Sequence, residues 1–323
     1  MISRRALLAT AAAAGFAARP ARGQAFPAKP IKVIVPFSPG GPGDVMARMA
    51  GQRMGAILGQ NFLVENRPGA GGTIGARAAA QAEPDGYTLM LANTSTLVIA
   101  PAVYRSVDYD PLKSFALIAI FGVTASIMAV NPGVPAKTVQ EFIALAKAQP
   151  GKLSFASPGI GTPPHLIGEL FKLRTGTDLV HVPYKGGGQS LGDVAGGQVQ
   201  MVFENPSITL PLARAGKVRA LASTGETRNP ASPELPTMIE SGLADFVTLS
   251  FTGLVAPAGT PTAIIDKLNA AANESLNAPD VHALLARLAV EPRPGTPADF
   301  AAFVARETEK WRAVINAAQI RID

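Results

Sequence analysis

The chain has 323 residues, 47% of them hydrophobic, and a formal net charge of +6 at pH 7. It contains no cysteine, which excludes disulfide bonds, a thiol nucleophile and cysteine-ligated metal. A chain of this length buries a sizeable core without such cross-links.

The N-terminus has the three parts of a secretory signal peptide in order. Arg4 and Arg5 precede an uncharged stretch, residues 6–18, and a segment of small residues ends at Ala25. The stretch is shorter than the roughly 20 apolar residues that span a bilayer. We therefore expect residues 1–25 to be a signal peptide that is cleaved after Ala25, and the protein to be periplasmic. The paired arginines fit either the general secretory or the twin-arginine route.

Cleavage would change the charge of the protein. Four arginines leave with the signal peptide, so the net charge falls from +6 to +2 (Arg4, Arg5, Arg19 and Arg22). No Lys/Arg-rich run remains in the rest of the chain. The sequence therefore indicates no nucleic-acid partner.

Short β-branched runs alternate with helical patterns along most of the chain. The apolar stretch 115–130 is interrupted by Gly122, Thr124 and Ser126, which predicts buried strands rather than a membrane span. This alternation predicts an α/β fold with mainly parallel sheets and helices on both faces. The other predicted strands are residues 31–35, 62–64, 87–91, 127–130, 153–156, 179–182, 199–203, 218–222 and 253–256.

Four residues are predicted to begin helices as N-caps: Asp44, Thr138, Thr260 and Thr296. Thr138 is followed three residues later by Glu141, which forms a capping box. Thr260 and Thr296 each precede a proline, a residue favoured in the first helical position.

The loops that follow the predicted strands are rich in glycine and hydroxyl residues. In open parallel sheets, ligands bind beyond the carboxyl ends of the strands. Glycines let a ligand approach the backbone, and helix N-termini offer free amides and partial positive charge. Lys185 is the only basic residue in these loops, so a carboxylate fits better than a phosphate. The loops are residues 37–44, 93–96, 157–162, 184–188 and 204–206.

Asp44 leaves two interpretations open. As an N-cap, its carboxylate would occupy the first-turn amides of its own helix, and the neighbouring glycines would serve the ligand. Alternatively, it would pair with a cationic group on the ligand.

No catalytic or cofactor motif is present. The sequence has no P-loop, dinucleotide fingerprint, zinc-protease motif or nucleophile elbow. His165, His181 and His282 are too scattered for a metal site, and His165 is better placed to position a ligand. A hydrolase using Ser157 or Ser95 would need a base that no motif supplies. We therefore expect no enzyme activity, no cofactor and no metal.

Several motifs, in this order, resemble the Bug (Bordetella uptake gene) or TctC-type substrate-binding proteins of tripartite tricarboxylate transporters. The resemblance covers nearly all of residues 26–323. The motifs are Pro30 to Phe37 with Pro39, Gly40, Gly41 and Asp44; Val64 to Gly72; Pro84 to Leu89; Gly161, Thr162, His165 and Leu166; Val182 to Gly186; Gly196 to Val199; and Ala256 to Pro261.

The resemblance implies a two-domain periplasmic-binding-protein fold of the Venus-flytrap, type II-like kind, with the ligand cleft between the lobes. Domain 1 would comprise residues 26–124 and 250–323, and domain 2 the inserted residues 125–249. The implied ligand is a small mono- or dicarboxylate or related organic acid, held partly through water. The implied ligand-binding residues are Phe37, Ser38, Gly40, Gly41, Asp44, Thr94, Ser95, Ser157, Gly161, Thr162, His165, Lys185, Gly186, Glu204 and Asn205.

The resemblance also implies the partners. A monomer would hand its ligand to two membrane subunits of a tripartite transporter. The alternative is a sensory carboxylate-binding protein that signals to a membrane receptor kinase.

The sequence departs from the family pattern at three positions. Glu204 stands where aspartate is frequent, Phe251 where tryptophan is usual, and Gln189 where proline is often found. Glu204 is one methylene longer than aspartate, which would shrink or redirect the far end of the pocket. These departures bear on the ligand rather than on the fold.

Overall fold

The computed structural model describes residues 26–105 and 107–322. The predicted signal peptide and its cleavage site after Ala25 lie outside the described residues. In the part of the chain that is described, no helix has both the length and the apolar character needed to cross a bilayer.

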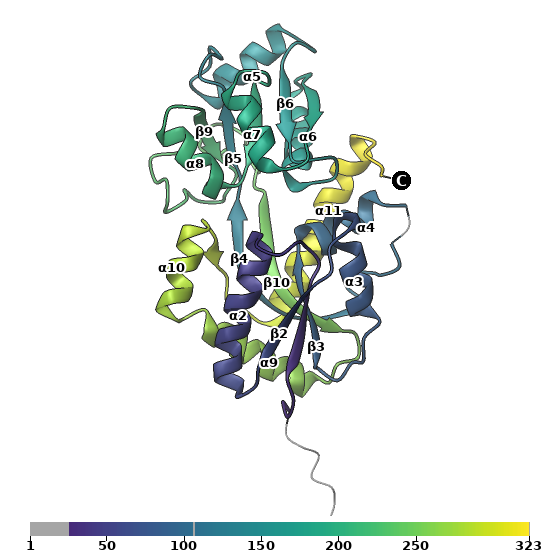
Figure 1. Cartoon of the computed structure of the whole chain (residues 1–323). Coiled ribbons are helices and arrows are strands. Elements are labelled where there is room, and N and C mark those ends of the chain that lie inside the picture. Colours follow the sequence, from purple (N-terminus) through teal and green to yellow (C-terminus); the bar gives the residue numbers. More distant parts are fainter. Residues whose placement is uncertain (1–25, 106, 323) are drawn as a thin grey trace, which may run out of the picture.

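A six-stranded sheet forms the centre of lobe 1, which occupies the lower half of Figure 1. The strands lie in the order β11, β4, β10, β3, β1, β2. β1 is parallel to β2 and β3, whereas β10 is antiparallel to β3 and β4. The strands are β1 (Ile31–Val35), β2 (Phe62–Asn66), β3 (Thr88–Asn93), β4 (Phe115–Ala125), β10 (Leu249–Pro257) and β11 (Glu291–Pro292).

A five-stranded sheet forms the centre of lobe 2, in the upper half of Figure 1. Its order is β7, β6, β8, β5, β9. β6 is parallel to β7 and β8, and β5 is antiparallel to β8 and β9. The strands are β5 (Ile127–Val130), β6 (Ser154–Ser157), β7 (Val180–Pro183), β8 (Met201–Glu204) and β9 (Arg219–Ser223).

The predicted α/β class is confirmed, with one refinement in strand direction. The parallel pairs are those whose strands lead into helices on the sheet faces. The antiparallel pairs involve the strands at the crossings, because one segment leaves lobe 1 after β4 and another returns to it as β10. Residue periodicity predicts strands but not their direction, which explains the difference.

The two crossing segments are bonded to each other through a buried hydroxyl. The Ser126 amide donates to Thr224 Oγ1 at 2.9 Å, and Thr224 Oγ1 donates to the Thr248 carbonyl at 2.8 Å. Thr224 is fully buried. This contact joins the outgoing and returning segments at the point where the lobes meet. The predicted domain limits at 124/125 and 249/250 stay a prediction.

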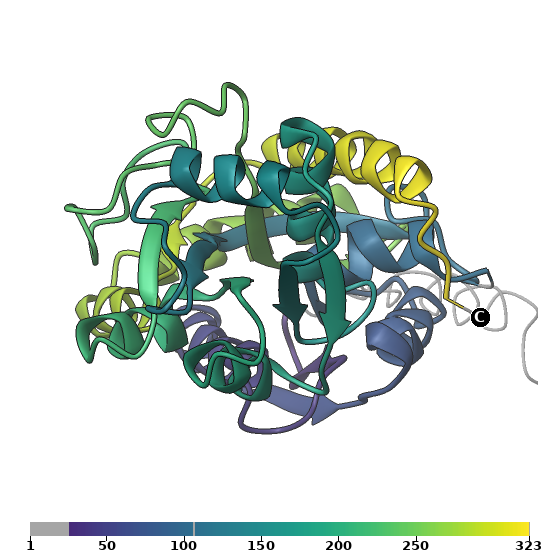
Figure 2. The same cartoon turned by 90° about the horizontal axis from the view of Figure 1, so that it is seen from above.

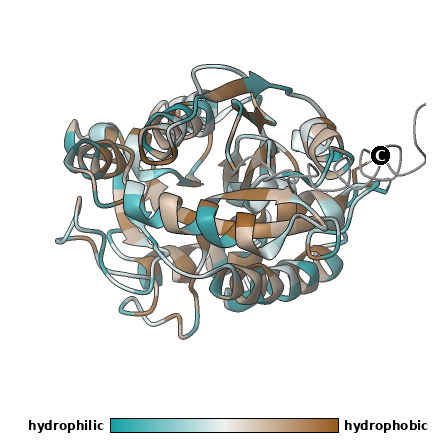
Figure 3. Cartoon of the chain, turned by 90° about the horizontal axis from the view of Figure 1, so that it is seen from below, coloured by the Kyte–Doolittle hydropathy of each residue, from teal (hydrophilic) through white to brown (hydrophobic). Residues whose placement is uncertain are grey.

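Helices cover both sheets, and Figure 3 shows apolar residues on the strands and inward helix faces. Lobe 1 carries α2 (Pro42–Leu58), the 3₁₀ turn η2 (Ala70–Gly72), α3 (Thr73–Ala80), the π-helical turn η3 (Ser95–Ile99), α4 (Ala100–Val103), α9 (Thr262–Ser275), α10 (Pro279–Arg287) and α11 (Pro297–Ala317). Lobe 2 carries α5 (Val139–Ala148), α6 (Pro163–Thr175), α7 (Gly187–Ala195) and α8 (Pro206–Arg214).

One core cluster includes residues of both lobes. It joins Phe155 and Phe171 of lobe 2 to Phe300 and Trp311 on α11. Helix α11 packs on β4 and also contacts α6, and it runs along one side of the molecule past lobe 2 in Figure 2. The buried face of this helix carries Phe300, Phe303, Val304, Trp311, Val314 and Ile315.

The C-terminal tail forms a further link between the lobes. The Ile322 amide donates to the Val103 carbonyl at 2.9 Å, at the end of α4. A Cβ placed on Gly161 of lobe 2 would lie 2.7 Å from Ile322 Cδ1. The tail therefore lies between the end of α4 and the loop that precedes α6.

Two of the four predicted N-caps are confirmed. The side chains of Thr138 and Thr296 accept from backbone amides three residues on. The other two predictions are wrong because a proline places the helix start elsewhere. Helix α2 begins at Pro42, so Asp44 lies in its first turn. Helix α9 begins after Pro261, and Thr260 Oγ1 donates to the Pro257 carbonyl instead.

Candidate functional site

A cavity of about 140 Å³ lies between the two lobes. This is below the lower end, about 300 Å³, of pockets for drug-sized ligands, so it suits a small molecule. Lobe 1 and the crossing strands supply Pro42, Met46, Asn93, Thr94, Ser95, Thr124, Ser250, Phe251, Thr252, Leu288 and Val290. Lobe 2 supplies Pro163, Asn205 and Ser207.

Two helices from different lobes begin at this cavity with open N-termini. Helix α2 begins at Pro42 after the N-cap Gly41, and α6 begins at Pro163 after the N-cap Thr162. Neither N-cap makes a side-chain capping bond. Pro42, Pro163 and Pro164 have no amide hydrogen, so the first-turn amides without a partner in their own helix are those of Gly43 and Asp44 in α2 and of His165 in α6. Each helix also adds partial positive charge at this end. The arrangement favours an anion between the lobes.

Asp44 is held by protein groups. Its Oδ2 accepts from the Gly40 amide and from Arg48 Nε, both at 3.0 Å, and its Oδ1 accepts from Asn66 Nδ2 at 2.9 Å. The hydrogen bonds from Arg48 and Gly40 lower the pKa of Asp44 from 3.8 to about 2, against the effect of burial. The side chain is a buried anion that fixes the loop before α2. Whether it also contacts ligand stays a prediction.

Thr94 and Ser95 follow β3 and line the cavity. Thr94 is buried, and its Oγ1 accepts from the Phe251 amide of β10 at 2.9 Å. The hydroxyl proton of Thr94 is then free to be donated. Next to it, Asn93 Oδ1 accepts from the Thr96 amide at 3.0 Å and so caps the turn η3.

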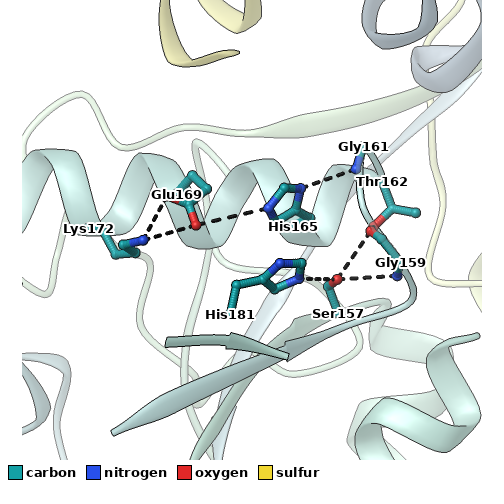
Figure 4. A network of polar contacts seen from close by, with 8 residues as sticks. All are labelled: Ser157, Gly159, Gly161, Thr162, His165, Glu169, Lys172 and His181. Atoms are coloured by element: carbon teal, nitrogen blue, oxygen red, sulfur yellow. Dashed lines mark hydrogen bonds and ion pairs between the residues drawn. The ribbon is translucent and has the colours of Figure 1, made fainter. Parts of the chain in front are cut away.

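The loop between β6 and α6 is held by bonds among its own residues (Figure 4). Thr162 Oγ1 donates to the Gly159 carbonyl at 2.7 Å, and the Gly159 amide donates to Ser157 Oγ at 3.2 Å. The Gly161 amide donates to His165 Nδ1 at 3.1 Å. In this arrangement the predicted donors Ser157, Gly161 and Thr162 shape the loop.

Two histidines stack beneath this loop. The rings of His165 and His181 are 3.9 Å apart between centroids, with planes inclined by 22°. Burial, aided by the charge of Lys172, lowers the pKa of His165 to about 4. Burial, aided by His165 and Lys172, lowers the pKa of His181 to about 3. Both rings are therefore neutral at neutral pH.

Ser157 and His181 do not form a catalytic pair. Ser157 Oγ lies 2.7 Å from His181 Nε2, the contact that a nucleophile and base would make. However, Ser157 is fully buried, and the low pKa of His181 makes it a weak base. In the described residues, no group of three or more His, Cys, Asp or Glu is placed to hold a metal ion.

Glu204 and Asn205 end β8 at the cavity. Asn205 caps α8 by accepting from the Ser207 amide at 2.9 Å. Glu204 is 5% exposed, and its Oε1 accepts from the Asn205 amide at 2.8 Å. Its Oε2 is buried without a hydrogen-bond partner. Burial raises the pKa of this carboxyl group.

Three of the predicted site residues line the cavity: Thr94, Ser95 and Asn205. Gly41 and Thr162 directly precede the lining prolines. The remaining predicted residues are not part of the lining: Phe37, Ser38, Gly40, Asp44, Ser157, Gly161, His165, Lys185, Gly186 and Glu204. Ligand contact by any of these residues stays a prediction.

The sequence did not predict most of the residues that lobe 1 contributes to the wall of the cavity. Ser250 and Thr252 alternate with buried residues on β10, and this polar alternation was an available signal. Leu288 and Val290 follow α10 and carry no polar signal in the sequence. Met46 lies on the buried face of α2 and looks like an ordinary core residue.

Comparisons with known proteins agree on one family. The family model "Tripartite tricarboxylate transporter family receptor" (TctC) matches residues 46–320. The protein BugT of Bordetella pertussis is 38% identical over 306 residues, covering 94% of each chain.

Two solved structures of similar proteins hold carboxylates. Rpa4515 of R. palustris, solved with adipate, is 33% identical with a TM-score of 0.80, covering 92% of this chain and 99% of the other. MatC of Rhodopseudomonas palustris, solved with malate, is 34% identical with a TM-score of 0.76, covering 90% and 100%. With its family model, these neighbours and its two-lobed fold, the chain belongs to the Bug/TctC family of periplasmic solute-binding proteins, which are not enzymes.

Proposed function

We propose that the protein captures a small carboxylate between its lobes in the periplasm and delivers it to the membrane subunits of a tripartite transporter. The observation that carries this proposal is the presence of two open helix N-termini, from different lobes, at one cavity. Free amides and partial positive charge bind an anion without a basic side chain.

The rest of the cavity supports an anionic ligand. Thr94 and Ser95 add hydroxyl donors from lobe 1, and Ser207 adds one from lobe 2. Two proteins of similar fold and sequence were solved with adipate and with malate, both of which are carboxylates.

Capture would proceed by closure of the lobes. The described lobes are joined by two crossing segments that share the Thr224 contact, which suits a hinge. A ligand that contacts Pro42 and Pro163 at once would favour the closed state, because it gains both helix N-termini only when the lobes approach.

Isothermal titration of the purified protein would test the binding step. A panel of small carboxylates should contain at least one acid with a micromolar Kd, and its carboxamide should bind at least tenfold more weakly. Equal binding of acid and amide would refute the role of the carboxyl group.

A charge placed in the cavity provides a second test. Ser95→Asp should abolish carboxylate binding by like-charge repulsion while leaving the fold intact, because Ser95 lies in the first turn of a helical segment. The matched control is Thr227→Asp, which places the same charge on an exposed position of lobe 2. If both variants bind as the unmodified protein does, the ligand lies elsewhere.

Location and transport are tested in cells. Mass spectrometry of the periplasmic fraction should find a protein that begins at Phe26. Deletion of the gene should abolish uptake of the bound acid. Intact uptake together with a lost transcriptional response to the acid would favour the sensory alternative.

A further inference from the structure

Among the described residues that line the cavity between the lobes, none could neutralise a second anionic group. None of the described residues that line it is an Asp, Glu, Lys, Arg or His. Lys185, the basic residue of the predicted loops, is exposed and is not part of the lining. Part of the wall is apolar, formed by Met46, Leu288 and Val290.

The other helix N-termini at the cavity are closed by the protein's own side chains. Asn205 Oδ1 accepts from the Ser207 amide and caps α8. Asn93 Oδ1 accepts from the Thr96 amide and caps η3. Of the described helices that begin at the cavity, only α2 and α6 lack a capping side chain, and the Asp44 carboxylate in the first turn of α2 is bonded to Gly40, Arg48 and Asn66 instead. One carboxylate therefore has a place, and a second does not.

Glu204 makes the lobe 2 side of the cavity unfavourable for a second anion. The carboxyl group lies 2.8 Å from the amide of Asn205, which lines the cavity. Among the described residues, none forms a hydrogen bond with Glu204 Oε2, which is buried. This oxygen is packed against the start of α7, since a Cβ on Gly187 would lie 2.6 Å from it.

We propose, on the basis of the function proposed above, that the cavity selects acids with a single carboxylate and an uncharged, largely apolar far end. Glu204, which is buried next to the lining residue Asn205 and leaves Oε2 without a hydrogen-bond donor, disfavours a second carboxylate from behind the cavity wall. A dicarboxylate would bury its second charge without a cation among the lining residues, which is costly in a site of low dielectric. A methylene chain would instead pack on the apolar wall.

The test compares three acids of the same chain length: hexanoate, adipate and monomethyl adipate. The ester keeps the six-carbon acid chain of adipate, adds one methyl group and removes one charge. In titrations at neutral pH, hexanoate and monomethyl adipate should each bind at least tenfold more tightly than adipate. The ratio of the Kd for adipate to the Kd for each of the other two acids is then measured for Glu204→Gln, which keeps the size of the side chain. This substitution should lower the ratio at least threefold.

The matched control is Glu240→Gln, which removes the same charge from an exposed ion pair with Arg228 on lobe 2. It should leave the preference unchanged. If Glu204→Gln does not fold, the ratio in the unmodified protein still decides the preference.

Each outcome separates this inference from the proposed function. Adipate that binds as tightly as its monoester would overturn the selectivity while leaving carboxylate capture intact. A strong preference that Glu204→Gln and Glu240→Gln change equally would overturn the role of Glu204. If none of the three acids binds but another carboxylate does, the apolar far end is wrong. If no carboxylate binds at all, the proposed function fails.

Discussion

Replacing Asp44 by asparagine tests how strongly the loop before α2 depends on one buried charge. The carboxylate accepts three hydrogen bonds, and its pKa falls from 3.8 to about 2 on folding. A shift of that size corresponds to about 2 kcal/mol of stability at neutral pH. Because the Arg48 side chain is 55% exposed, water screens part of this energy. We expect Asp44→Asn to cost about 1–2 kcal/mol.

The lowered pKa of Asp44 also predicts how the stability difference between the two proteins changes with pH. The folded-state pKa of Asp44 is depressed, so its contribution is complete well above 3.8 and is lost as the pH falls through about 2. Asparagine does not titrate. The stability difference between the two proteins should therefore shrink as the pH falls, to roughly half at pH 3.

Urea unfolding followed by tryptophan fluorescence would measure the difference. The chain has a single tryptophan, Trp311, which is buried in the core cluster shared by both lobes. Asp280→Asn is the control, since Asp280 pairs with Arg53 on the surface and should contribute little. A difference for Asp44→Asn that stays constant from pH 6 to pH 3 would refute the reasoning.

Three further predictions concern the cavity and the loop before α6. Thr94→Val removes the acceptor of a buried β10 amide and should lower stability by about 1–3 kcal/mol, whereas Thr94→Ser should keep it, as thermal unfolding will show. The pKa of His181 is lowered from 6.5 to about 3, so the unfolded state takes up this proton at a higher pH than the folded state does and stability falls as the pH falls from 6.5 towards 3; His181→Gln should flatten this slope in urea titrations. Gly161→Ala should cost about 1–2 kcal/mol because Gly161 has a φ of 74° and faces Ile322, whereas Gly188→Ala has open space and should be nearly neutral in the same assay.

The sequence predicted the elements that depend on local patterns. Alternation of β-branched runs with helical segments placed most strands to within two residues, and β1 and β5 without error. Thr138 and Thr296 were identified as caps because their hydroxyls bond amides only three residues away. Such contacts are encoded within one helical turn.

The features that the sequence did not predict depend on contacts between segments that are distant in the chain. Strand direction at the crossings depends on which strand returns to which sheet. The wall formed by Met46, Leu288 and Val290 exists only because α2 and the segment after α10, far apart in the sequence, reach the same cavity. The misplaced cap at Asp44 had a local cause, since Pro42 fixes the start of α2 two residues earlier.

The positions of the first and last residues that the structure describes, Phe26 and Ile322, matter for anyone attaching a label or a surface to this protein. Phe26 contacts Lys267 and Tyr87 at the sheet edge where β1 and β3 begin, the edge opposite the cavity (Figure 1). Ile322, in contrast, touches the loop that leads into α6. A fusion partner or immobilising tag on the N-terminal side of Phe26 would leave the mouth between the lobes free. The same tag after the C-terminal tail would lie next to the loop that leads into α6, whose first residue Pro163 lines the cavity, and would therefore be the less favourable choice for binding measurements.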